Sequence, residues 1–228
     1  MGKADHTPIP RYRAFAEPVL FRHGFRPFFL AAALWAPIAL LLFLGDFLGW
    51  TNLPPLADPI AWHHHELLFG FVAAAVAGFA LTAIPNWTGR LPLQGPPLML
   101  LAAAWLAGRI AMLLAAMLPA WLVAAVDLAF LTALLIVAGR EIIAGRNGRN
   151  LPIMLALGLL LLAHGLAHAD LSSTDLAHRL AIAVIITLIG LIGGRIVPSF
   201  THNWLAKRQA TRLPVAFNRF DRACVALT

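Results

Sequence analysis

Six long apolar segments constrain this sequence more than any other feature. Each is about 20 residues long, the length that a helix needs to cross the hydrocarbon core of a bilayer. Hydrophobic residues make up 61% of the chain and charged residues only 12%, which excludes an ordinary water-soluble domain. The sequence therefore predicts an all-α fold, a polytopic membrane bundle of six transmembrane helices. The predicted spans lie near residues 27–48, 60–84, 97–118, 120–139, 151–170 and 177–197.

The polar segments divide the chain into three predicted regions. Residues 1–26 form an N-terminal segment, residues 27–197 the bundle, and residues 198–228 a basic loop followed by the start of a possible seventh helix. The N-terminal segment has no apolar core, so the first span is expected to serve as both insertion signal and anchor. Pro119 predicts a tight hairpin between the third and fourth spans, and the polar stretch "GREIIAGRNGRN" predicts the next connection.

The basic residues predict the orientation of the bundle. If the N-terminus is cytoplasmic, nearly all lysines and arginines lie on the inner side, while only Arg179 lies outside and Arg109 lies within the membrane. This asymmetry follows the positive-inside rule and predicts a multi-pass protein of the bacterial inner membrane. Because topology explains the net charge of +7, nucleic acid is not expected as a partner.

Histidines are expected to gather at the outer side of two helices. Residues 63–65 are three consecutive histidines at the outer end of the second span, and His164 and His168 share one face of the fifth. At ~1.5 Å per residue, His65 lies ~6 Å below the outer boundary, and His168 and His164 lie ~3 and ~9 Å below it. Successive helical residues turn by about 100°, so at most two of the three consecutive histidines can point inward. His64 is the expected bystander.

Imidazoles at one depth suggest a metal or haem site. Neutral imidazole binds haem iron axially and also suits copper. The candidate metal ligands are His63, His65 and His168, and His164 joins them as a candidate haem ligand. Glu66 lies three residues after His63 and is expected to orient its ring. His178 and Asp58, in the flanking outer loops, could join the site. The alternative is that the histidines are hydrogen-bonded interfacial residues, and for His178 this is the simpler reading.

Charged residues suggest two further features. Arg109 lies ten residues before Pro119 and Asp127 eight after it, so the hairpin brings them to similar depth. A structural ion pair is the simpler expectation, and a haem-propionate partner or proton relay is the alternative. At the inner side, Arg90 and Arg195 either anchor the bundle beside tryptophans or bind a propionate or another anion.

Three stretches together resemble the NnrS family of membrane proteins. They are "FRHGFRPFFLAAALWAP", "WHHHELLFGFVAAAVAGFALTAIPNWTGR" and "IGGRIVPSFTHNW", and "FDR" follows near the end. The family motif falls on Trp62, His63, His65 and Glu66, with His64 at its variable position. The resemblance implies a haem (heme)- and copper-containing protein of the bacterial inner membrane, linked to nitric oxide metabolism and resistance to nitrosative stress.

One departure from the family pattern concerns length. Family members usually have about twice as many spans, so the resemblance covers the N-terminal half. A second subunit or another copy would then be expected to complete the site, and an electron donor is a further expected partner. The competing hypothesis is a non-redox transporter or assembly subunit with a histidine-lined metal or proton path. The sequence has no GxSxG, HExxH or phosphate-loop motif and identifies no catalytic residue.

Overall fold

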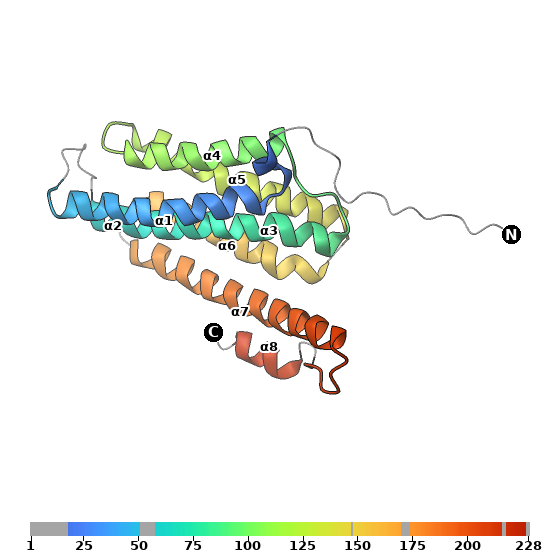
Figure 1. Ribbon diagram of the computed structural model, residues 1–228. Coiled ribbons are helices and arrows are strands. Elements are labelled where there is room, and N and C mark those ends of the chain that lie inside the picture. Colours follow the sequence, from blue (N-terminus) through green and yellow to red (C-terminus); the bar gives the residue numbers. More distant parts are fainter. Residues whose placement is uncertain (1–17, 51–57, 147, 170–173, 216–217, 227–228) are drawn as a thin grey trace. The chain divides into compact units, whose positions relative to one another are not determined.

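The computed structural model describes residues 18–50, 58–146, 148–169, 174–215 and 218–226, and within these ranges it contains helices and no strand (Figure 1). The side chains of residues 149, 174, 175, 195, 219, 222, 225 and 226 also lie outside the described part. Six helices are long and apolar enough to cross a membrane, which confirms the predicted fold class. They are Phe25–Phe47, Pro59–Thr88, Pro96–Leu113, Ala120–Ala144, Leu151–His168 and Leu176–Lys207.

The chain divides into two compact units, residues 1–151 and 152–228. In the first unit, α1 (Phe25–Phe47) packs along α3 (Ala73–Thr88) and along the π-helical segment η2 (Glu66–Val72). The short helix α2 (Pro59–His65) precedes η2 in the same span. Helix α4 (Pro96–Leu113) packs on α5 (Ala120–Ala144), which also contacts α3. These four spans bury Phe28, Phe69, Leu98, Phe130 and Leu134 almost completely.

Small residues allow α1 and α3 to approach closely. The buried face of α3 carries alanines, including Ala73 and Ala77. A Cβ atom on Gly78 would lie 2.7 Å from Cδ1 of Phe29, so any larger residue would have to displace this ring. Close contact through small residues is typical of helices that associate in lipid, where burial of apolar surface gives little driving force.

The hairpin between the third and fourth spans is confirmed. Helix α4 ends at Leu113, and α5 begins directly after Pro119. The polar connection that follows is shorter than predicted, because α5 continues through Ala144 and includes the first six residues of "GREIIAGRNGRN". This last turn is stabilised in two ways: the Ile142 side chain is buried at 2% exposure, and the Glu141 carboxylate pairs with Arg90.

The second unit contains α6 (Leu151–His168) from Pro152 onward, because this helix begins at the unit boundary. The unit also contains α7 (Thr174–Lys207) and α8 (Arg219–Ala226). Helix α7 extends ten residues beyond the predicted end of the sixth span, with Pro198 inside it. Helix α8 lies where the start of a seventh apolar helix is expected, and it packs on α7.

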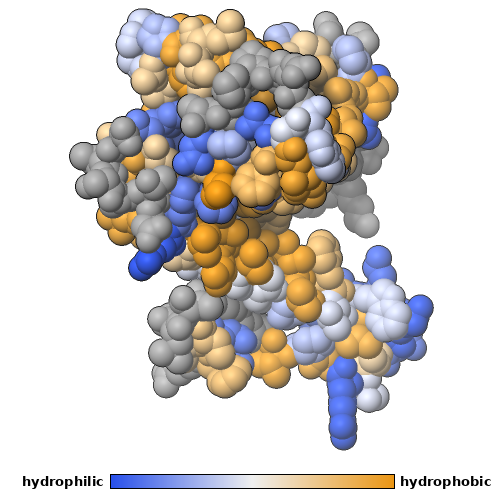
Figure 2. Space-filling view, turned by 90° about the vertical axis from the view of Figure 1, so that its left-hand side faces the viewer, coloured by the Kyte–Doolittle hydropathy of each residue, from blue (hydrophilic) through white to orange (hydrophobic). Residues whose placement is uncertain are grey.

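Large apolar side chains remain exposed along the helices. Leu41, Leu100, Ile136, Leu155 and Ile189 are each 65–73% exposed. Figure 2 looks onto the end at which α1 ends and α2 begins, and it shows hydrophilic residues gathered among hydrophobic ones. An exposed apolar surface of this kind suits a lipid environment rather than water.

Candidate metal centre

Four polar side chains form a buried network in the first unit. His65 and Glu66 lie at the junction of α2 and η2, Arg109 lies in α4 and Asp127 in α5. Each is at most 6% exposed. Charged groups at this depth are costly unless they are paired, so their mutual contacts decide whether the arrangement is stable.

Glu66 connects three helical segments. Its Oε2 atom accepts hydrogen bonds from Nε1 of Trp35 on α1 and from Nη1 of Arg109, both at 2.7 Å. Its Oε1 atom lies 3.3 Å from Nδ1 of His65. A carboxylate with three donors is held in one position, and it thereby ties α1 and α4 to η2.

Asp127 closes the network from the opposite side. Its Oδ1 atom pairs with Nη2 of Arg109, which confirms the ion pair predicted from the hairpin. Its Oδ2 atom lies 3.1 Å from Nε2 of His65. Arg109 therefore contacts one oxygen of each carboxylate, and His65 lies near the other oxygen of each.

Two glycines make room for these polar groups. A Cβ atom on Gly70 would lie 2.7 Å from Nη1 of Arg109 and 2.8 Å from Oε2 of Glu66. A Cβ atom on Gly108 would lie 2.7 Å from Oδ1 of Asp127. Gly70 belongs to the π-helical segment, and its carbonyl accepts a 3.0 Å hydrogen bond from Nε1 of Trp105. Short π-helical segments are frequent at functional sites, where they change the direction of side chains.

We expect Gly70→Ala to destabilise the protein by about 1–3 kcal/mol, because the added methyl group overlaps the Arg109 and Glu66 side chains. Gly158→Ala is the matched control, since a Cβ atom at that helical position would contact nothing within 4 Å. Thermal unfolding in detergent measures both variants. Equal unfolding temperatures for the two would show that the space around Gly70 is not restrictive.

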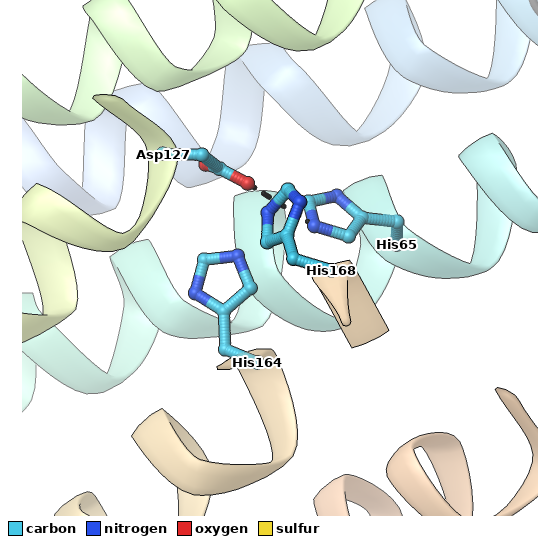
Figure 3. A group of neighbouring side chains, drawn as sticks. All are labelled: His65, Asp127, His164 and His168. Atoms are coloured by element: carbon cyan, nitrogen blue, oxygen red, sulfur yellow. Dashed lines mark ion pairs between the residues drawn. The ribbon is translucent and has the colours of Figure 1, made fainter. Parts of the chain in front are cut away.

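His65 and Asp127 form an ion pair, and the spacing of their atoms also suits a small metal ion (Figure 3). Ligand bonds to zinc or copper are about 2 Å long, so donors at angles of 90–110° around one ion lie roughly 3 Å apart. The 3.1 Å between Nε2 of His65 and Oδ2 of Asp127 agrees with this geometry. On the other side of the ring, Glu66 can accept the Nδ1 proton, which directs Nε2 toward the metal position.

A second pair of imidazoles lies in α6. His164 and His168 are one helical turn apart, and their ring centroids are 5.2 Å apart, which confirms that they share a face. His164 is 1% exposed and His168 is half-buried at the end of the helix. Figure 3 draws this pair together with His65 and Asp127.

Comparison with known proteins identifies the family. The family model described as "NnrS protein" matches residues 19–228. The chain belongs to the NnrS family. No curated protein matches it. No solved structure matches it either.

The NnrS motif residues have different environments. Trp62 is buried, as are His65 and Glu66, whereas His63 is half-buried with its ring stacked on Phe43 at 4.3 Å. His64 is exposed, as expected for the variable position. The expectation that Glu66 orients His63 is wrong, because its carboxylate bonds to Trp35 and Arg109 and lies beside His65.

Asp58 and His178 were expected in the outer loops that flank the site. Asp58 caps α2, because its Oδ1 atom accepts hydrogen bonds at 3.0 Å from the backbone N–H groups of Ile60 and Ala61. His178 lies within α7 rather than in a loop.

In this NnrS family member both ring nitrogens of His65 have carboxylate neighbours. An axial haem ligand directs one ring nitrogen at iron in the centre of a flat porphyrin. The Asp127 carboxylate lies in that direction, 3.1 Å from Nε2 of His65. His63 differs, because its buried Nδ1 atom has no hydrogen-bond partner among the described residues. It is therefore the better candidate for haem on this span.

Of the two inner arginines named in the sequence analysis, only Arg90 has a described side chain. Arg90 pairs with Glu141 on α5, so part of its charge is already neutralised. The side chain of Arg195 lies outside the described residues, and its predicted role is not addressed.

The sequence analysis missed Asp127 as a partner of His65 and Trp35 as a partner of Glu66. The sequence does carry a signal for Asp127. His65 is the seventh residue of α2 and Asp127 is the eighth residue of α5, and both helices begin at the same end of the first unit (Figure 1). At about 1.5 Å per residue this gives them nearly equal depth. No comparable signal identifies Trp35, Gly70 or Gly108.

Proposed function

We propose that this chain binds a copper ion and that the bound metal serves nitric oxide metabolism and resistance to nitrosative stress. The observation that carries the proposal is the buried His65–Asp127 pair, whose donor atoms are 3.1 Å apart. A carboxylate and an imidazole at ion-ligand spacing, inside a membrane bundle, suit a bound cation.

From the depths that the sequence predicts, we propose His164 and His168 as the remaining ligands. Both lie in the last turns of α6. Three imidazoles and one carboxylate would complete a four-coordinate site. These donors suit copper, zinc and non-haem iron, and membership of the NnrS family favours copper.

The protein groups have separate proposed roles at this site. Asp127 contributes negative charge, Arg109 keeps Asp127 and Glu66 in place, and Glu66 orients the His65 ring. Copper held by imidazoles can bind a small diatomic ligand and exchange one electron. The electron would come from a donor protein or a second subunit. Haem is a separate proposal, which rests on the family resemblance, and His63 is its candidate ligand.

We also propose that the protein lies in the bacterial inner membrane with a cytoplasmic N-terminus. The support is the family, the six spans and the concentration of arginine and lysine on one side. The reaction of Cys224, the single and exposed cysteine, with a membrane-impermeant thiol reagent measures this orientation.

Metal analysis tests the proposed function. Protein purified after expression with added copper and haem precursor is expected to contain about one copper per chain, as three imidazoles and a carboxylate make one four-coordinate site. Electron paramagnetic resonance of the oxidised protein is expected to show nitrogen coupling from imidazole. Copper-free protein that also fails to bind added copper would overturn the copper site. Haem is tested separately by a Soret band that His63→Ala removes.

A further inference from the structure

A cavity lies in the first unit, away from the metal centre. Its volume is about 360 Å³, within the range of small-molecule sites. Its lining comes from α3, from the segment that follows it, and from the end of α5. Gly89, in a left-handed conformation at φ 71°, ends α3 and allows the chain to turn into that segment.

The lining is apolar except at three residues. Nine of the twelve lining residues are alanine, leucine, isoleucine, valine or proline, and the other three are Gln94, Arg140 and Glu141. Gln94 already donates a 2.7 Å hydrogen bond to the carbonyl of Arg22. The lining contains no histidine, cysteine, methionine or tyrosine, so it offers none of the usual axial ligands of haem iron.

Arg140 lines this cavity, and Arg90 pairs with the lining residue Glu141. Arg90 uses its Nε atom to pair with Glu141, and its terminal amino groups donate to no described residue. Arg140 lies 3.7 Å from the same carboxylate, and its side chain is 76% exposed. Two guanidinium groups and one carboxylate give this edge of the cavity a net charge of +1, with donors still available.

We propose that this cavity binds an acyl chain of an anionic phospholipid, whose phosphate contacts Arg90 and Arg140. The apolar lining accommodates the hydrocarbon, and the guanidinium groups match the geometry and charge of a phosphate. In the proposed orientation this edge faces the cytoplasmic leaflet, where basic residues attract anionic headgroups. The site is independent of the metal centre, since no residue is shared.

Lipid titration of the purified full chain tests the charge of the ligand. Native mass spectrometry compares phosphatidylglycerol and phosphatidylcholine that carry identical acyl chains. We expect phosphatidylglycerol to bind more tightly, and Arg140→Gln to reduce its affinity about five-fold and that of zwitterionic phosphatidylcholine less. Arg146→Gln removes one exposed charge outside the cavity and is the matched control. Equal affinities for both lipids in the unmodified protein would overturn the proposal.

A cavity-filling variant tests the position of the acyl chain. Val137 lines the cavity, and the adjacent Ile136 does not and is 65% exposed. We expect Val137→Phe to abolish the preference for phosphatidylglycerol, while Ile136→Phe retains it. If Val137→Phe leaves the preference unchanged, the lipid is not bound in this cavity. Because Arg140 is exposed, its variant remains informative even if Val137→Phe fails to fold.

Discussion

Arg109→Leu is expected to destabilise the protein by about 3–5 kcal/mol, the cost of removing one partner from a buried charge network. Arg109 is 1% exposed and contacts Glu66 and Asp127 at the same time. Without it, two buried carboxylates would remain with only His65 between them. Unfolding of the purified protein in detergent with increasing denaturant measures the loss.

Two comparisons isolate the charge effect of Arg109. Arg90→Leu removes the other arginine that pairs with a carboxylate between helical segments, but at a side chain that is 38% exposed, and it should cost less than about 1 kcal/mol. The triple variant Glu66→Gln, Arg109→Leu, Asp127→Asn removes the unpaired charges and should be more stable than Arg109→Leu alone. A triple variant no more stable than the single one would contradict the explanation by buried charge.

His65→Ala is expected to weaken copper binding by at least about 100-fold. Loss of a residue that only supports a ligand typically costs 10–100-fold in metal affinity, and His65 is proposed to bind the ion directly. Competition with a chelator of known affinity measures the change. His168→Ala, at the end of α6, is expected to weaken binding as well and does not remove a residue of the Arg109 network.

The neighbouring histidine provides the control for this experiment. His64→Ala removes an exposed imidazole one residue away and should leave copper affinity unchanged. The unfolding of the metal-free variants shows whether each one is folded. A folded His65→Ala protein with unchanged copper affinity would contradict the assignment of His65 as a ligand.

The two pairings of Arg109 and Glu66 show how far the sequence reaches into the site. The Arg109–Asp127 pair could be predicted, because the two residues lie at similar distances along the chain from Pro119. In a helical hairpin, residues equally far from the turn lie at similar heights on the two helices. Glu66 could not be paired correctly, because its partners Trp35 and Arg109 come from helices 31 and 43 residues away. Position along a helix gives depth but not which neighbouring helix a side chain faces.

The sequence by itself determined the six spans, the hairpin at Pro119 and the pairing of Arg109 with Asp127. It could do so because a lipid-exposed segment must satisfy its backbone hydrogen bonds internally, so length and apolarity suffice to specify a helix. Only the tertiary structure decided that His65 rather than His63 is fully buried, and that Gly70 and Gly108 make room for the network. These helices are apolar on nearly every side, so their sequences do not reveal their rotation about the helix axis. That rotation depends on how neighbouring helices pack.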